Sequence, residues 1–182
     1  NIAFHLNKHD FLEKSFIDKF VQVVEELKTD KPIQYILGET EFAGIDFQLN
    51  SETLIPRPET EELVMWIVES GVRPGARVLD IGTGSGCIIV SLGKLLKGGR
   101  FYGVDISPEA VRQAADNARR NGVEVDFEVR DILHYGEWEW PGFDVIVSNP
   151  PYVRESEREF MHDGVLNYEP SRALFVPDAD PL

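Results

Sequence analysis

The sequence has 182 residues, of which 42% are hydrophobic and 10% aromatic, a composition typical of a folded domain rather than a disordered chain. Its 18 basic and 32 acidic residues give a net charge of −14, which disfavours binding to nucleic acids and other polyanions. The single cysteine excludes an intramolecular disulfide and fits a reducing compartment. No membrane-length apolar run and no signal peptide are found, so we expect a soluble, cytoplasmic protein.

Residues 1–30 are predicted to be helical. Apolar side chains recur there at intervals of three and four, namely Phe16, Ile17, Phe20, Val21, Val24 and Leu27. His5 and His9 stand one helical turn apart, but no third ligand is near them, so we predict exposed side chains and no metal site. Pro32 is expected to end the helix.

Residues 33–49 change period. The segments 34–37 and 45–49 alternate around Gly38 and Gly44, which predicts a β-hairpin that acts as a linker and packs on a neighbour. A second helix is expected to begin at Pro58 and to end at Gly71.

The start of this second helix allows two interpretations. The stretch around Pro58 is either a well-capped helix terminus or a polar lip that supplies Arg57 or the nearby glutamates to a ligand. The proline and the glutamates suit the first turn of a helix, which favours the interpretation as a capped terminus.

From residue 76 the pattern alternates strand and helix. Strands are predicted at 77–81, 101–106, 125–129 and 143–148, with helices after the first two strands. This order indicates an α/β fold with a doubly wound parallel sheet. Ligands of such sheets bind beyond the carboxyl ends of the strands.

A glycine loop follows the first of these strands. Its residues are Gly82, Thr83, Gly84, Ser85 and Gly86. Glycines allow a tight turn and close approach of a ligand. Asp105, which ends the next strand, is positioned to bind a ribose. Asp80 beside the loop would repel a pyrophosphate but attract the cationic amino end of S-adenosylmethionine, so this cofactor is preferred. Asp131 could face the adenine amino group or simply cap a turn.

The last predicted strand ends in Asn149, Pro150, Pro151 and Tyr152. Two prolines lock the backbone and remove two amide donors. The side-chain oxygen of Asn149 and the backbone oxygen of Pro150 could then hold both hydrogens of a planar –NH2 group and present its nitrogen to an activated methyl carbon. A rigid structural turn is the alternative interpretation.

Together, the glycine loop and the Asn-Pro-Pro-Tyr segment resemble those of class I S-adenosylmethionine-dependent amino methyltransferases, which have a Rossmann-like fold. The stretches 54–61 and 168–175 narrow the resemblance to HemK-type protein-(glutamine-N5) methyltransferases, which modify the glutamine of the Gly-Gly-Gln motif in peptide chain release factors. The resemblance spans roughly residues 32–175 and implies translation-termination factors as partners.

By matching position, the resemblance implies that 82–86 line the methionine end of the cofactor, with Asp105 on its ribose. Asn149 and Pro150 would hold the substrate amide, while Pro151 and Tyr152 shape the pocket. S-adenosylhomocysteine would be the product. The implied division is 1–31 as the end of a helical recognition domain, 32–53 as the hairpin linker and 54–182 as the methyltransferase domain, with its C-terminal strands expected to be missing.

Two other functions remain open. An adenine-N6 methyltransferase acting on DNA or RNA shares the Asn-Pro-Pro-Tyr pocket, although the acidic composition argues against a nucleic-acid partner. A non-catalytic cofactor-binding module is the second.

Overall fold

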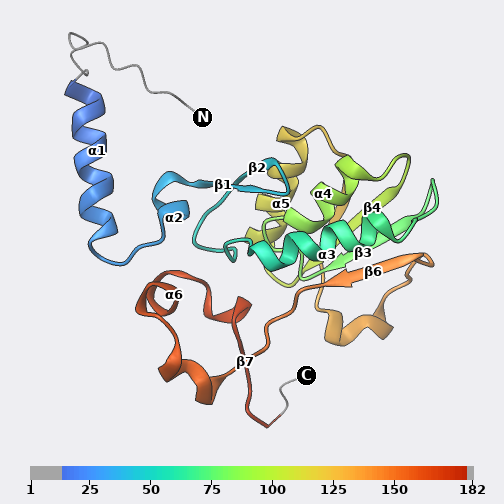
Figure 1. Cartoon of the computed structure of the whole chain (residues 1–182). Coiled ribbons are helices and arrows are strands. Elements are labelled where there is room, and N and C mark those ends of the chain that lie inside the picture. Colours follow the sequence, from blue (N-terminus) through green and yellow to red (C-terminus); the bar gives the residue numbers. More distant parts are fainter. Residues whose placement is uncertain (1–13, 180–182) are drawn as a thin grey trace.

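The computed structural model of the protein describes residues 14–179 (Figure 1). At its centre lies a sheet of four parallel strands, in the order β5 (Val125–Val129), β4 (Arg100–Asp105), β3 (Arg77–Ile81) and β6 (Val145–Ser148). The predicted α/β fold with a parallel sheet is therefore confirmed. The predicted bounds of β3 and β5 match those of the structure, and those of β4 and β6 differ by one or two residues.

Three helices cover one face of this sheet: α3 (Pro58–Glu69), α4 (Cys87–Leu95) and α5 (Pro108–Arg120) (Figure 1). Because side chains alternate along a strand, Val78 and its paired neighbours point toward these helices. Val78 is fully buried and belongs to the same apolar cluster as Ile89 of α4. The core therefore lies between the helices and this face.

The opposite face is partly covered by residues that follow β5. A 3-10 helix, η1 (Ile132–Glu137), and the chain after it pass beneath the sheet (Figure 1). The ring of Phe143 packs edge-to-face on Tyr102 of β4 at 5.3 Å between centroids. Ile146 of β6, the strand at the sheet edge, is 61% exposed on this face. Between residues 14 and 179, every helix is too short or too polar to cross a membrane.

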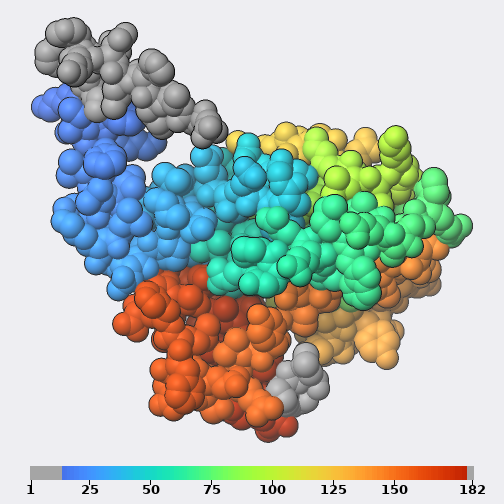
Figure 2. All heavy atoms as spheres, in the orientation of Figure 1, coloured from blue at the N-terminus to red at the C-terminus, as the bar shows by residue number. Residues whose placement is uncertain are grey.

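The N-terminal helix stands away from the sheet (Figures 1 and 2). It is α1 (Lys14–Leu27), which confirms the predicted helix over 14–27; the helix ends three residues before the predicted bound, and residues 28–30 form a turn. Its apolar stripe is not buried, since Phe20 is 61% exposed and Phe16 57%. His5 and His9, considered as metal ligands from the sequence, lie outside the described residues.

The prediction of a strand at residues 34–37, the first half of the hairpin, is wrong. The segment taken as a strand is a short helix, α2 (Ile33–Leu37), and the hairpin pairs β1 (Glu39–Phe42) with β2 (Ile45–Gln48). Pro32 precedes the helix, and Gly38 ends it in a left-handed conformation with φ 75°, its N–H donating to a carbonyl oxygen of the preceding turn. A proline before and a glycine after a segment are helix boundaries, which outweigh four alternating residues.

The hairpin packs on its neighbours, as predicted. Phe42 and Phe47 are each 1% exposed, and their rings meet edge-to-face at 6.1 Å between centroids. Both belong to the apolar cluster that contains Ile89. The hairpin is therefore part of the main core.

The chain after β6 forms a smaller unit below the sheet (Figures 1 and 2). It contains β7 (Val153–Arg154), η2 (Glu155–Phe160), α6 (Asp163–Tyr168), η3 (Ser171–Ala173) and β8 (Phe175–Val176). The two short strands pair in parallel. This unit brings the residue after α6 back to the start of α3.

Candidate active site

The residues predicted to act together lie along one edge of the sheet. Asp131 follows β5, Asp105 ends β4, the glycine loop 82–86 follows β3, and Asn149 follows β6. Ile81 pairs with Ser148, so the glycine loop and the Asn-Pro-Pro-Tyr segment leave adjacent strands at the same level. The structure therefore confirms that the two loops lie side by side at the carboxyl ends of parallel strands, where ligands of such sheets bind.

The glycine loop uses its backbone N–H groups internally. Gly82 and Thr83 both donate to the carbonyl oxygen of Val104, at 2.8 and 3.0 Å, and Gly86 donates to Thr83. Gly84 donates to the Asp105 carboxylate at 2.9 Å. A pyrophosphate site needs such groups free to point at the anion. The loop therefore suits a ligand without phosphate.

Positive φ angles shape this loop and keep its surface open. Gly82 has φ 71°, and a Cβ added there would meet no atom within 4 Å. Gly84 has φ 55°, and its nearest atom would be a backbone oxygen at 4.0 Å. Side chains at these two positions would project into the space beside the loop, so glycine leaves room there for a ligand.

Asp80 lies beneath the loop and is fully buried. One oxygen accepts a 2.7 Å hydrogen bond from the Thr83 hydroxyl, while the other has no hydrogen-bond partner among the described residues. Burial raises the pKa of the Asp80 carboxyl to about 7, against the lowering effect of the Thr83 hydrogen bond. Asp80 thus anchors the loop, and its predicted attraction for a cationic ligand remains a prediction.

Asp105 joins the end of β4 to two neighbouring backbones. Its Oδ2 accepts from Gly84 N–H and its Oδ1 from Ser107 N–H, each at 2.9 Å. Each carboxylate oxygen keeps a second lone pair. The structure thus gives Asp105 a positioning role, and the predicted ribose contact would add to it.

Asp131 caps η1. Its side chain accepts from Leu133 N–H at 3.0 Å and lies 3.0 Å from Nδ1 of His134. The turn-cap interpretation is thereby confirmed, and contact with an adenine remains a prediction.

Asn149 contacts a residue that the sequence analysis did not single out. Its Nδ2 lies 3.4 Å from Oγ1 of Thr60, a buried residue in the first turn of α3. Pro150 is exposed and Tyr152 is 66% exposed, so both residues are accessible to a ligand at the sheet edge. The position of Thr60 could have been found from its spacing, because it lies four residues before Val64, on the buried stripe of the helix.

Arg57 is paired rather than free. Its Nη2 lies 2.6 Å from Oε1 of Glu169, whose side chain is 1% exposed. The second oxygen of Glu169 accepts from Ile55 N–H at 3.4 Å. Arg57 therefore holds the start of α3 to the C-terminal unit through a tertiary ion pair.

Asn117 of α5 is another residue that sequence reasoning missed. Its side chain is fully buried and bonds both backbone groups of Gln48 and the carbonyl oxygen of Ser85. It thus connects the hairpin to the glycine loop. In the sequence it is an ordinary polar residue in a helix, and only its fit to the 3.6-residue period of the buried face hints at this role.

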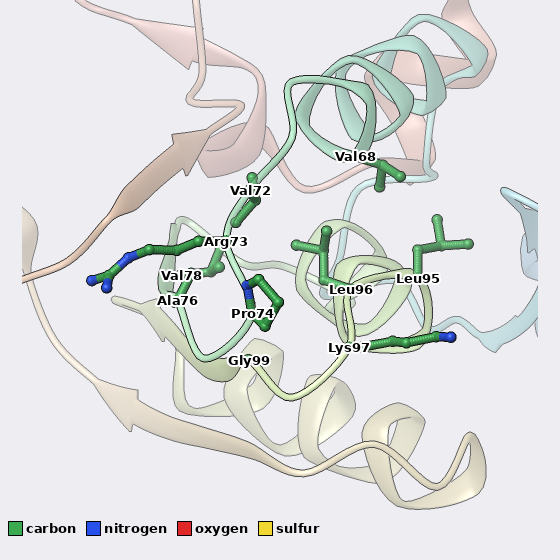
Figure 3. Close-up of a pocket in the computed structure, with 10 residues that line it drawn as sticks. All are labelled: Val68, Val72, Arg73, Pro74, Ala76, Val78, Leu95, Leu96, Lys97 and Gly99. Carbon is green, nitrogen blue, oxygen red and sulfur yellow. The ribbon is translucent and has the colours of Figure 1, made fainter.

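Two hollows lie at the opposite end of the sheet. One, of about 260 Å³, is bounded by Val68, Val72, Pro74, Ala76, Leu95 and Leu96 (Figure 3). The other, of about 480 Å³, adjoins the first residues of β4 and β5. Both adjoin the amino ends of strands, so neither belongs to the candidate site.

Within 14–179, no three His, Cys, Asp or Glu side chains gather as a metal site would require.

The sheet and its loops match a known protein family. A profile described as "Methyltransferase domain" matches residues 73–176, more than half of the chain. The chain belongs to this methyltransferase family. This segment contains the parallel sheet, the glycine loop and the Asn-Pro-Pro-Tyr segment, so all four strand-end elements of the site lie within the methyltransferase domain.

Similar proteins extend the match beyond this domain. The chain is 49% identical over 164 residues to a release factor glutamine methyltransferase of Flavobacterium psychrophilum, covering 88% of the chain and 57% of that protein. It is 47% identical over 161 residues to the protein of the same name from Bacteroides thetaiotaomicron, with the same coverage. The chain thus spans a little over half the length of these relatives.

A solved structure supports the fold. A Pyrococcus abyssi tRNA (uracil-54, C5)-methyltransferase in complex with S-adenosyl-L-homocysteine aligns with a TM-score of 0.51 and 22% identity, over 76% of the chain and 34% of that protein. At this identity the likeness supports the fold and nothing further.

Proposed function

We propose that this methyltransferase domain transfers a methyl group from S-adenosylmethionine to the side-chain amide N5 of the glutamine in the Gly-Gly-Gln motif of peptide chain release factors. The observation that carries the proposal is the pairing of Ile81 with Ser148, which sets a glycine loop beside Asn149. The names and 47–49% identity of the relatives support the substrate.

The order of groups along the sheet edge suits an extended cofactor. Asp131, Asp105 and the glycine loop follow successive strands, about 5 Å apart, in the order in which an adenine, a ribose and an amino-acid portion would meet them. The internally bonded loop amides and the carboxylate of Asp105 favour a cationic ligand without phosphate. S-adenosylmethionine supplies a methyl group on a positively charged sulfur.

The chain's own contribution is to hold the acceptor. The Asn149 Oδ1 and the Pro150 carbonyl oxygen accept the two hydrogens of the glutamine amide, which fixes the plane and direction of its nitrogen. Pro151 and Tyr152 form the wall against which that amide lies. Such positioning can lower a barrier by several kcal/mol, since the entropy of alignment is removed before the reaction.

A nucleic-acid substrate is the second candidate, because adenine-N6 methyltransferases use the same four-residue segment. The net charge of −14 speaks against it. We propose that the partner is a protein and that the domain acts in the cytoplasm, where its single cysteine, Cys87, stays reduced.

The test uses methyl-labelled S-adenosylmethionine with three acceptors: a release factor, the same factor with the Gly-Gly-Gln glutamine changed to alanine, and a DNA duplex. We expect label on the intact factor alone. Asn149→Ala should lower the rate by about 100-fold, as loss of one positioned polar group does in other active sites. Asn167→Ala, an exposed site on α6, is the matched control and should keep the full rate. Label on DNA would support the second candidate instead.

A further inference from the structure

Thr60 lies against Asn149 although 89 residues separate them in the chain. The Thr60 residue is 8% exposed, so its hydroxyl is largely withdrawn from water. The 3.4 Å distance between Oγ1 and the Asn149 Nδ2 allows one hydrogen bond. The amide of Asn149 is therefore held from the side of α3.

This contact bears on which end of the Asn149 amide meets the acceptor. An asparagine carboxamide has an oxygen that only accepts hydrogen bonds and a nitrogen that only donates them. With Nδ2 directed at Thr60, Oδ1 is at the other end of the carboxamide. The proposed function requires Oδ1 to accept from the glutamine –NH2 group. If the Asn149 carboxamide were flipped, its Nδ2 donor would face the –NH2 donor of the glutamine.

The first turn of α3 is itself fixed in place. Thr60 N–H donates to the Arg57 carbonyl oxygen at 2.9 Å, which closes the turn. The guanidinium of Arg57 pairs with the buried carboxylate of Glu169 at 2.6 Å. A helix start held by an ion pair with a buried carboxylate places the Thr60 hydroxyl with little freedom.

We propose that Thr60 is a positioning residue for methyl transfer. It accepts a hydrogen bond from Asn149 Nδ2 and so keeps Oδ1 directed at the acceptor amide. The inference rests on the proposed function and adds a residue outside the Asn-Pro-Pro-Tyr segment. Thr60 acts through Asn149 and contacts neither substrate nor cofactor in this role.

The chain offers a matched control in Thr53. This residue is 1% exposed, and its hydroxyl has no hydrogen-bond partner among the described residues. Thr53→Val removes a buried hydroxyl of the same kind seven residues before Thr60. It keeps the backbone oxygen of Thr53, which accepts from the Tyr35 hydroxyl at 2.7 Å.

The experiment measures kcat and KM for the release factor, the dissociation constant of S-adenosylmethionine and the thermal midpoint for each variant of the full chain. Thr60→Val should lower kcat by about tenfold, the effect of one lost hydrogen bond on a positioned group, with KM and cofactor affinity within about twofold. Thr60→Ser, which keeps the hydroxyl, should restore kcat to within about threefold. Thr53→Val should leave kcat unchanged. If Thr60→Val does not fold, Thr60→Ala replaces it.

A double-mutant cycle separates positioning from packing. In the Asn149→Ala background, Thr60→Val should cause no further loss of rate, because the side chain through which Thr60 acts is gone. An equal loss in both backgrounds, or an unchanged kcat in Thr60→Val, would overturn the inference. If instead the unsubstituted protein labels no release factor, the proposed function itself fails.

Discussion

The side chain of Asn117 donates a 2.9 Å hydrogen bond to the carbonyl oxygen of Ser85, and thereby ties helix α5 to the glycine loop. The same amide also donates to the carbonyl of Gln48 and accepts from its N–H, so one fully buried residue holds the hairpin, the helix and the loop together.

Asn117→Asp should therefore be strongly destabilising. The aspartate would place a carboxylate oxygen against two carbonyl oxygens in a fully buried site. We expect the free energy of unfolding to fall by about 3 kcal/mol, as for other buried polar groups left without partners. Urea denaturation measures the change. Asn167→Asp, at an exposed position, should change it by less than about 0.5 kcal/mol, and similar losses in the two variants would contradict the assignment.

Gly82→Ala should weaken cofactor binding more than it weakens the fold. Gly82 and Gly71 have φ angles of 71° and 76°, and an added Cβ meets nothing within 4 Å at either site. Both alanine variants should lose about 1 kcal/mol of stability from the left-handed backbone. Only Gly82→Ala projects a methyl group beside the loop, so it alone should raise the dissociation constant of S-adenosylmethionine, by about tenfold, measured by calorimetry. Equal affinities of the Gly82→Ala and Gly71→Ala variants for S-adenosylmethionine would show that the loop does not contact the cofactor.

Asp80 should make stability fall as pH rises. Burial raises its pKa from 3.8 to about 7, so between these values the folded state holds a proton that the unfolded state has released. Its contribution is therefore most favourable below pH 4 and is lost as the pH rises through 7. Asp80→Asn lacks this effect. The difference in unfolding free energy between variant and native protein should grow in the variant's favour, by on the order of 3 kcal/mol, from pH 4 to pH 8.

Comparing the two proteins at each pH cancels the other titrating groups. Several act in the opposite sense, since a backbone hydrogen bond from Arg77 and the Arg73 side chain lower the pKa of Asp144. A pH-independent difference between native protein and Asp80→Asn would show that Asp80 is ionised in the fold at all these pH values.

The Arg57–Glu169 pair should respond asymmetrically to substitution. The Glu169 side chain is 1% exposed whereas that of Arg57 is 35% exposed, so a lone arginine can be hydrated and a lone carboxylate cannot. Arg57→Met should cost about 3 kcal/mol, and Glu169→Gln about 1 kcal/mol. Arg119→Met, which breaks an exposed pair with Asp116, should cost less than about 0.5 kcal/mol. Equal costs for Arg57→Met and Glu169→Gln would contradict the burial argument.

The local features of this chain could be predicted from its sequence. Short segments rich in Val, Leu, Ile and Phe and bounded by turn residues identify the strands at 77–81 and 125–129, and Pro58 and Gly71 bracket a helix. The topology follows, because strands that alternate with helices form a parallel sheet. The convergence of the glycine loop and Asn149 at one edge is a direct result.

Contacts between distant segments could not be predicted in the same way. Nothing in the neighbourhood of Thr60 indicates that Asn149 will lie beside it, and Glu169 reaches Arg57 across 112 residues. These pairs depend on where the unit after β6 folds back. The prediction for segment 33–37 is wrong for another reason. Four or five residues fit both the helical and the strand period, and only the flanking Pro32 and Gly38 identify the segment as a helix.

The burial of Phe42 and Phe47 has a consequence for how the protein unfolds. The hairpin has no separate core of its own, so its amides can open to solvent only when the cluster around Ile89 opens as well. Hydrogen exchange in β1 and β2 should therefore be as slow as in β3. The segment that looks like a connector in the sequence would unfold in the same cooperative step as the central sheet.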